Sequence, residues 1–542
     1  MGPGTRSEAA RTVMESLHVV TVEPIMFVLS MTNYMRTPAS QLLVLHKVCI
    51  QSYNDTVCGD VDEKSAAVEN DVQANAAHWN FLLKMALFIP GAIVSSLYGP
   101  LSDRLGRRMF LIIPSLGSIL GAVSFLFQTY FPMMPLDYLI ASEIAVGLSG
   151  NVVTAYIIAK SYLCDVTDGT NRTKRLGVMK AMSHIGGPIG AFLSGVLIDM
   201  KGFAPVYFIL AGIHVLVVLY VVFWLEETVD YESDQELSSG GDEDDTSEDE
   251  ERAEDEEIET KGKEEPQAGQ EKVEKEGEAD DGKRERFWGE TRDSIRQSFR
   301  EVWKSLRSML LVCFRERLGC RRKYLLLAML IGIIHNICST AEMDLIVLYT
   351  KHSPLNWTAT TIGVFISVRT ALKAATLVLG LPAIFKIVKN HSMQLDLGLT
   401  SIGIISTSAA LTMIAFAKST TVMMIAAAVG MLVSFPSVTI TSIKSKLVEP
   451  QEYGSLFAVT ALIQTLTSVA SSGLFNNLYA ALLPIWPGLP FLVTVGFYAL
   501  SLLLVLYIWY DVKVQSKEEE LMTDRPGPKY KELKNIEDGK TD

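Results

Sequence analysis

The chain has 542 residues, of which 49% are hydrophobic and 20% are charged, and its formal net charge is −13 at pH 7. This apolar content, with a mean hydropathy of +0.25, argues against an ordinary soluble domain. The apolar and charged residues must therefore be segregated along the chain.

Residues 1–19 are expected to form a cytoplasmic N-terminus. Met1 to Glu15 contains no short apolar core followed by a small-residue cleavage site, so no cleavable signal peptide is predicted. The first apolar stretch should therefore be retained as a membrane helix.

Apolar segments long enough to cross a bilayer recur along the chain. A hydrocarbon core about 30 Å thick requires roughly 20 helical residues at about 1.5 Å rise each. At that length the sequence predicts twelve spans, near residues 20–45, 77–99, 109–131, 136–162, 176–199, 203–225, 323–349, 361–385, 396–417, 421–445, 455–482 and 490–511. They divide into an N-terminal six-helix bundle (20–225) and a C-terminal six-helix bundle (323–511), separated by a cytoplasmic linker (226–322) and followed by a cytoplasmic tail (512–542).

The short loops set the orientation of these spans. Lys and Arg follow spans two, four, eight and ten, whereas the loop at 46–76 is rich in Asp and Glu. Short cytoplasmic loops are enriched in Lys and Arg, so both chain termini should face the cytoplasm.

This topology sorts the glycosylation motifs and the cysteines. The sequons at Asn54 and Asn356 lie outside and are candidates for glycosylation, although a three-residue motif also arises by chance. Cys49 and Cys58 share an outer loop and are the candidate disulfide. The remaining cysteines have no metal-ligand spacing, and no metal site or cofactor is predicted.

The linker contains two contrasting segments. Residues 230–282 are acidic and almost free of aromatic and branched apolar residues, so we expect disorder and a possible role in docking a cytosolic partner. The basic segment that follows places Ile295, Phe299, Trp303 and Leu306 at helical spacing. It is predicted either to lie on the anionic inner leaflet or to pack against the inner face of the bundle.

Between spans two and three the chain reads "GPLSDRLGRR". The simplest interpretation is a positive-inside loop; the alternative is a charged latch that holds one gate shut while the other opens. The spacing G-x-L-S-D-R-x-G-R-R resembles the signature of the major facilitator superfamily. The resemblance implies an all-α integral membrane protein of twelve transmembrane helices, in two pseudo-symmetric six-helix bundles that move by alternating access. Its gating-motif residues here are Gly99, Asp103, Arg104, Gly106, Arg107 and Arg108.

A narrower resemblance covers nearly the whole chain outside the acidic segment. "VEPIMFVLSM" in span one, "CDVTDGTNRTKRLGVMKA" before span five, "DLIVLYTKHSPLNW" after span seven and the long segment "SKLVEPQEYGSLFAVTALIQTLTSVASSGLFNNLYAALLP" are similar to solute carrier family 46. That family contains the proton-coupled folate transporter and its thymic stromal and lysosomal relatives.

Several functional positions of the folate transporter differ in this chain. Its acid in span four aligns with Asn151, and its span-five acid, implicated in proton coupling, aligns with Lys180. Its span-seven histidine aligns with Ser339, one turn from His335, and its span-ten arginine aligns with Thr441. These differences argue against folate as the cargo and against the same proton relay.

Ionisable residues inside the spans are costly, so they commonly face a cavity. The basic ones are Arg36, Lys160, Lys180, Arg369 and Lys373, and the acidic ones are Glu23, Glu143, Glu342 and Asp344. Lys180 and His184 share a helix face, as do Arg369 and Lys373. If these faces turn inward, the cavity is positively biased and suits an organic anion.

Each of these residues also has a structural interpretation. Glu23, Lys160, Glu342 and Asp344 lie near predicted span ends, where helix-end pairing or snorkelling explains them, and we favour this for Lys160 and Asp344. His184 and His335 are either packing residues or groups that couple proton entry to transport.

The sequence has no P-loop and no nucleophile elbow, so neither an ATP-driven pump nor an enzyme is predicted. We expect a secondary active transporter of a small organic anion, with protons as the candidate coupling ion. A ligand-sensing membrane scaffold and a channel or scramblase are the alternatives. The expected location is the plasma membrane, with the lysosomal or endosomal membrane as the alternative.

Overall fold

The computed structural model describes residues 21–53, 58, 66–167, 169–228, 315, 317, 320–388, 392–449 and 452–524, and all regular elements in these ranges are helical. Predictions that concern the N-terminus, Asn54, the acidic segment 230–282 and the basic helix near 295–310 fall outside these residues.

The described chain forms twelve helical passes, as the sequence predicts. The N-terminal half consists of α2 (Glu23–Ser52), α4 (Ala66–Leu105), α5 (Arg107–Tyr130), the pair α6 (Asp137–Leu148) and α7 (Asn151–Asp165), α8 (Gly169–Lys201) and α9 (Ala204–Trp224). The C-terminal half consists of α12 (Arg321–Lys351), α13 (Ala359–Ala375) with α14 (Leu381–Ile387), α15 (Met393–Ala415), α16 (Thr420–Val429) with α17 (Ser434–Lys446), α18 (Tyr453–Leu482) and α19 (Leu489–Asp524). Ten of the described passes are long and apolar enough to cross a membrane.

Three passes are interrupted, which the sequence analysis did not predict. The fourth breaks between α6 and α7, where Gly150 and Asn151 have φ of 95° and 49°. Left-handed backbone conformations end a regular helix and favour Gly and Asn. The eighth contains a π-helical turn, Thr376–Gly380, and the tenth a 3-10 turn, Gly430–Val433.

The second pass differs from its predicted bounds at both ends. Helix α4 begins at Ala66 and continues through Gly99, so Gly99 does not end the span as the sequence analysis expects. The break comes at Gly106, whose φ of 97° is in the left-handed region.

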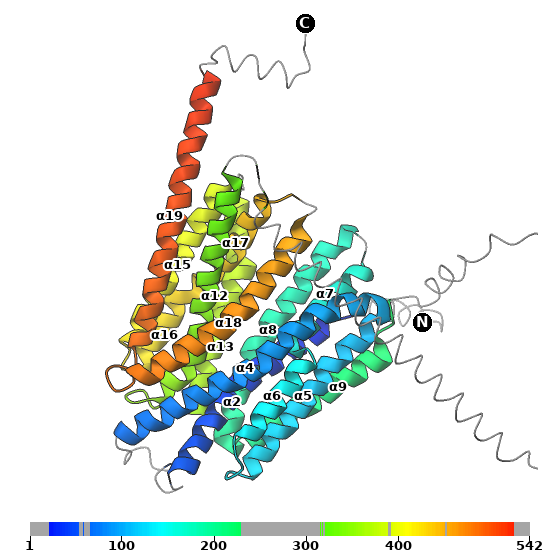
Figure 1. Ribbon diagram of the computed structural model, residues 1–542, viewed down its shortest axis with the longest axis vertical. Coiled ribbons are helices and arrows are strands. Elements are labelled where there is room, and N and C mark those ends of the chain that lie inside the picture. The colour runs from blue at the N-terminus through cyan, green and yellow to red at the C-terminus, as the bar shows by residue number, and fades with distance from the viewer. Residues whose placement is uncertain are drawn as a thin grey trace, which may run out of the picture.

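The two halves contact each other along α8 and α13 and along α4 and α18 (Figure 1). We call the end of the molecule that carries the loop between α2 and α4 the outer end, and the opposite end the inner end. The hydrogen bonds between the two halves, among the described residues, lie at the outer end or in the outer part of the helices. Toward the inner end the ribbons of the two halves diverge (Figure 1). The two halves are therefore joined at the outer end, and we refer to this arrangement as inward-facing because the inner end is the predicted cytoplasmic end.

Two arginines anchor the chain that precedes α12 to the inner end. Arg315 and Arg317 pair with Glu452, at 3.0 Å and 2.7 Å, in the connection between α17 and α18. Burial alone would raise the pKa of the Glu452 carboxyl, but hydrogen bonds from Arg317 and Arg315 lower it below its ordinary value. The start of α12 is thus attached to the C-terminal half itself.

Candidate substrate pathway between the two halves

A buried carboxylate joins the two halves near the middle of their contact. Asp344 of α12 forms an ion pair with Lys84 of α4, and the Ser472 hydroxyl of α18 donates a hydrogen bond to it. Asp344 is 2% exposed. The explanation of Asp344 as a helix-end residue is therefore wrong, because its partner lies on the other half.

A second ion pair lies at the centre of the C-terminal half. Arg369 of α13 pairs with Glu342 of α12, and both side chains are buried. Glu342 thus pairs within the membrane rather than at a helix end. Arg369 is shielded by this partner and does not present a free charge.

A small cavity, which we call the central cavity, adjoins this pair. It has a volume of about 60 Å³, and its walls come from α2, α12 and α13, with Tyr34, Arg369 and Lys373 among the lining residues. The face shared by Arg369 and Lys373 therefore does turn inward, toward the contact between the halves.

The N-terminal half has an ion pair of its own. Arg36 of α2 pairs with Glu143 of α6, and its guanidinium lies 5.8 Å from the centre of the Phe125 ring. Arg36 also lines a small cavity with His214. As with Arg369, a carboxylate compensates the charge.

Of the basic residues that the sequence analysis places inside the spans, Lys160, Lys180 and Lys373 have no carboxylate partner among the described residues. Lys160 and Lys180 are exposed, and both belong to one electrostatic cluster with His184. Arg36 and Arg369 are neutralised locally by carboxylates, whereas Lys373 lines the cavity beside Arg369. A positive bias of that cavity stays a prediction.

The two candidate histidines lie in different halves. The Nε2 atom of His184 and the Nδ1 atom of His335 are buried and have no hydrogen-bond partner in the described part of the chain. The His335 ring lies 6.0 Å from the ring of Tyr498. Within the described ranges, neither histidine has a carboxylate that would hold its proton.

Asn151 is a structural residue in this arrangement. Its side-chain oxygen accepts a hydrogen bond of 2.7 Å from the N–H of Val153, at the first turn of α7. A Cβ atom at Gly91 of α4 would lie 2.5 Å from its side-chain nitrogen, so the two helices approach closely here. The position that aligns with a family acid thus supports the helix break.

The segment 99–108, which we call the signature loop, is held within the N-terminal half. Arg107 donates to Asp165 at the end of α7 (3.0 Å) and to Ser102 of α4 (2.8 Å). Glu227 accepts hydrogen bonds from the N–H groups of Arg107 and Arg108, at 2.7 Å and 3.2 Å, and so caps α5.

The described contacts of Arg107 and Arg108 lie within the N-terminal half. Arg108 donates to the carbonyl of Val222 in the same half. The side chains of Asp103 and Arg104 fall outside what the structure describes, although the backbone of Gly99, Asp103 and Arg104 belongs to α4. The role of Asp103 as a latch remains a prediction.

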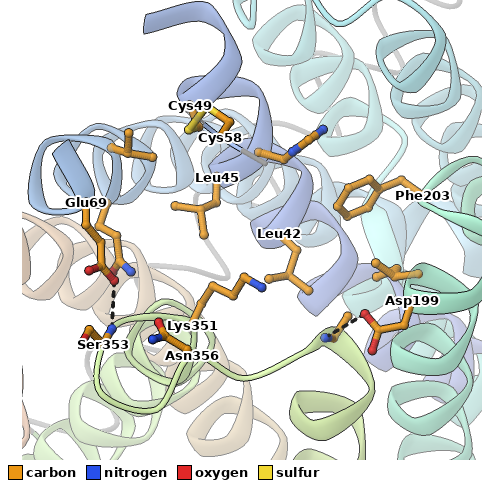
Figure 2. A pocket seen from close by; sticks show the side chains of 15 residues that line it. Leu42, Leu45, Cys49, Cys58, Glu69, Asp199, Phe203, Lys351, Ser353 and Asn356 are labelled. Carbon is orange, nitrogen blue, oxygen red and sulfur yellow. Dashed lines mark hydrogen bonds between the residues drawn. A yellow bond between two sulfur atoms is a disulfide. The ribbon is translucent and has the colours of Figure 1, made fainter. Parts of the chain in front are cut away.

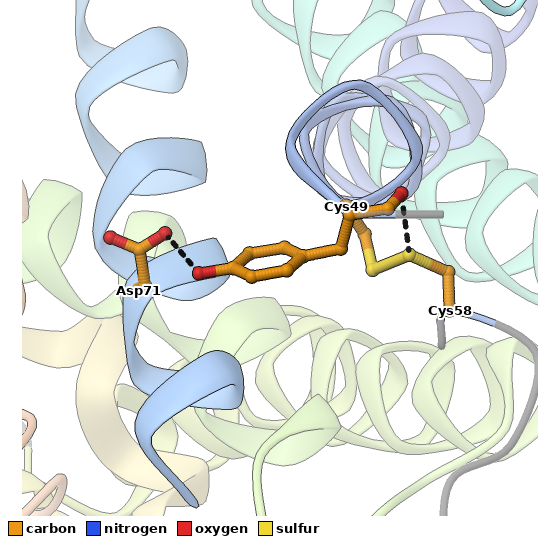
Figure 3. The surroundings of a disulfide bond; sticks show 4 residues. Cys49, Cys58 and Asp71 are labelled. Atoms are coloured by element: carbon orange, nitrogen blue, oxygen red, sulfur yellow. Dashed lines mark hydrogen bonds between the residues drawn. A yellow bond between two sulfur atoms is a disulfide. The ribbon is translucent and has the colours of Figure 1, made fainter. Parts of the chain in front are cut away.

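The outer end carries a disulfide and an exposed sequon. Cys49 and Cys58 are joined, with Cα atoms 5.9 Å apart, and the neighbouring Tyr53 hydroxyl donates to Asp71 of α4 (Figure 3). Asn356 is exposed in the loop before α13. Glycosylation of Asn356 remains a prediction.

Sequence reasoning missed Lys84. It lies inside the second predicted span, 77–99, and its partner is 260 residues away. A single lysine inside an apolar helix is itself a signal of a functional or paired position. No cluster of three or more potential metal ligands occurs in the described ranges.

Comparison with known proteins gives a consistent result. The sequence profile described as Major Facilitator Superfamily matches residues 25–472. The human lysosomal proton-coupled steroid conjugate and bile acid symporter SLC46A3 is 23% identical, covering 94% of this chain and 100% of its own. The rat proton-coupled folate transporter is 23% identical over 89% of this chain and 91% of its own.

Solved structures share the fold at low identity. The human organic anion transporter MFSD10 has a TM-score of 0.54 at 14% identity, covering 89% of this chain and 98% of that one. A POT family transporter in complex with a thioalcohol-conjugated peptide has a TM-score of 0.52 at 12% identity, covering 90% of this chain and 95% of that one.

Proposed function

Because the chain belongs to the major facilitator superfamily, we propose that it is a secondary active transporter that carries a small organic anion by alternating access. The superfamily is one of membrane transporters rather than enzymes, and the relatives along nearly the full length are solute carriers of family 46. The chain is a multi-pass integral membrane protein.

The observation that carries the anion assignment is the position of Lys373. It lines the central cavity one turn from Arg369, and no carboxylate pairs with it among the described residues. Lys373 is half-buried. An ammonium held partly out of water without a counter-ion is unfavourable, so an incoming carboxylate or sulfonate gains from neutralising it.

The Lys84–Asp344 pair gives the alternating movement a physical basis. These residues lie on opposite halves, so the pair must separate if the outer end is to open. Separation would leave a buried carboxylate and a half-buried ammonium unpaired, which is costly unless the substrate or a proton compensates one of them. An anion near Lys84 or a proton on Asp344 would supply that compensation.

We also infer that protons are the coupling ion. The relatives named above are described as proton-coupled. The acids aligned with the folate transporter are replaced by Asn151 and Lys180, so Asp344, His184 and His335 are the remaining candidates in the pathway. The proposed location is the plasma membrane, with the lysosomal membrane as the alternative outcome.

An uptake screen tests this function. Cells that express the full chain would be offered labelled folates, cyclic dinucleotides, muropeptides and steroid conjugates at neutral and at acidic external pH. We expect saturable uptake of at least one anion, faster at acidic pH. Binding without uptake would favour a scaffold, and uptake that does not saturate would favour a channel.

A further inference from the structure

A glutamate inside the N-terminal half is only partly satisfied. Glu143 of α6 is buried, and its Oε1 atom accepts a hydrogen bond from the Arg36 guanidinium of α2. Its Oε2 atom is also buried and has no hydrogen-bond partner in the described part of the chain. A buried carboxylate is costly unless it is paired and hydrogen-bonded. The ionised form of Glu143 therefore depends on Arg36.

Helix α9 places two titratable side chains beside this pair. The Tyr207 ring stacks on Phe125 at 5.2 Å, and the Arg36 guanidinium lies over the same Phe125 ring. His214 and Arg36 line a cavity of about 20 Å³, which is space for one water. The Tyr207 hydroxyl and the Nδ1 atom of His214 are buried and have no hydrogen-bond partner among the described residues. The pair thus adjoins a small polar space inside the bundle.

Helices α4 and α5 also pack against α6. Helix α5 has no ionisable residue between positions 109 and 129, and α4 has one between positions 79 and 97, which is Lys84. Lys84 pairs with Asp344 of the opposite half. Arg36 is therefore the cation that stabilises the charge of Glu143 in the described structure.

Arg36 lies on a turn of α2 that can bend. Pro38 is inside this helix and has no N–H, so the hydrogen bond to the carbonyl of Tyr34 is missing. The Arg36 side chain is 26% exposed and that of Glu143 is 4% exposed, so only Arg36 can leave the pair toward more open surroundings. Tyr34, Thr37 and Pro38 line the central cavity, so a movement of this turn changes both places.

The outer contacts between the halves are formed while Arg36 and Glu143 are paired. Glu69 accepts a hydrogen bond of 2.8 Å from the N–H of Ser353, and Asp199 accepts one of 3.1 Å from the N–H of Ala359 (Figure 2). Leu42 of α2 lines the same cavity as these four residues. Opening of the outer end must break these contacts and so changes the surroundings of α2.

We propose that Glu143 is a proton-binding site of the N-terminal half, and that Arg36 keeps it deprotonated in the inward-facing arrangement. When α2 bends at Pro38 and withdraws Arg36 in the outward-facing state, the unpaired carboxylate takes up one proton and becomes a neutral acid. Return of Arg36 to Glu143 releases that proton toward the inner end. Proton binding follows from this geometry, whereas its use in coupling rests on the proposed function.

Infrared spectroscopy of the purified full chain in lipid nanodiscs tests proton binding without any substrate. Arg36→Gln removes the cation, so we expect a carboxylic-acid C=O band at neutral pH that is missing from the wild type and from Arg36→Gln/Glu143→Gln. Arg175→Gln is the matched control. Its partner Glu23 also accepts a hydrogen bond from the N–H of Thr21 and lies in the first turn of α2, where the helix dipole stabilises a carboxylate. This control should show no band.

Two results would overturn the assignment. One is the absence of the band in folded Arg36→Gln, and the other is a band that persists in the double variant. If Arg36→Gln does not fold, acid titration of the wild type and of Glu143→Gln decides the question. The wild type should then show one buried carboxylic-acid band that Glu143→Gln lacks, and identical titrations would refute the site.

Uptake into proteoliposomes tests the coupling role. An acidic exterior should accelerate entry of a labelled steroid sulfate severalfold in the wild type. Glu143→Gln resembles the neutral acid, so it should retain exchange of internal for external anion and lose this acceleration. Glu23→Gln, which removes another buried carboxylate paired with an arginine, is the control and should keep the acceleration.

Acceleration that persists in Glu143→Gln, or loss of exchange in the folded variant, would refute the coupling role. A wild type that takes up none of the anions in the uptake screen would refute the proposed function instead. In that case the infrared comparison still decides whether Glu143 binds a proton.

Discussion

Arg369 and Lys373 lie one turn apart on α13, yet only Arg369 has a carboxylate beside it in the described structure. Breaking a buried ion pair leaves an unpaired charge and costs several kcal/mol, on the order of 3–5. A change in transport by variants of Arg369 or Glu342 could therefore reflect lost stability as well as lost substrate binding. Lys373 is the better probe of the cavity.

For Lys373→Met we predict normal surface abundance and a rise of about tenfold or more in the KM for the transported anion, since the attraction to its charge is lost. Initial-rate uptake in cells, normalised to surface protein, measures this. Lys386→Met, exposed on α14, is the control and should transport normally. An unchanged KM in Lys373→Met would remove the cavity assignment.

Gly106 provides a second test at this scale. An alanine there would adopt a strained φ of 97°, and its Cβ would lie 2.6 Å from a Glu227 oxygen that caps α5. We predict that Gly106→Ala destabilises the protein by on the order of 1–2 kcal/mol from strain, and further by displacing this cap.

Thermal unfolding of purified variants checks this prediction. Gly202→Ala is the matched control, because Gly202 also has positive φ but nothing lies within 4 Å of an added Cβ. Gly106→Ala should therefore lower the Tm more than Gly202→Ala. Equal shifts in Tm would mean that the Glu227 side chain moves aside without loss of stability.

Helices α8 and α13 form the closest contact between the halves, and glycines permit it. A Cβ at Gly195 would lie 2.4 Å from the carbonyl of Ala359, and the Cα of Gly363 is 3.1 Å away. Small residues let membrane helices approach to backbone contact. This contact should therefore exist only in the inward-facing arrangement.

We predict that Gly195→Val shifts the protein toward outer opening, because the added methyl groups cannot fit against α13. Thr37 lines the central cavity, so a membrane-impermeant maleimide outside the cell reaches the thiol of Thr37→Cys only when the outer end opens. Labelling of this thiol should become severalfold faster in Gly195→Val. Gly212→Val on α9, where an added Cβ meets nothing within 4 Å, should not change it. Slower labelling in Gly195→Val would contradict the role given to this contact.

The sequence predicted the twelve passes because lipid requires long apolar helices, and that requirement is visible residue by residue. It did not predict the break at Gly150 and Asn151, although the run "GLSGN" carries the small and left-handed-tolerant residues that such a break requires. The pairing of Lys84 with Asp344 could not be predicted, since only the tertiary fold brings α4 beside α12. The pairing of Arg369 with Glu342 could not be predicted either, because the two residues are on different helices.

At the scale of the whole molecule, the contacts between the halves describe one state of a two-state cycle. Glu69, Asn70 and Gln73 of α4 reach the C-terminal half at the outer end. No hydrogen bond joins the inner ends of the halves among the described residues. An outward-facing state must exchange these contacts for others at the inner end, where the signature loop lies.

Exchange across proteoliposomes shows whether the protein works as a carrier by alternating access. The purified full chain would be reconstituted, the vesicles loaded with an unlabelled anion identified in the uptake screen, and entry of the labelled anion measured. We predict saturable entry that the internal anion accelerates, because a carrier returns faster when loaded. Entry that is unaffected by the internal anion and does not saturate would contradict it.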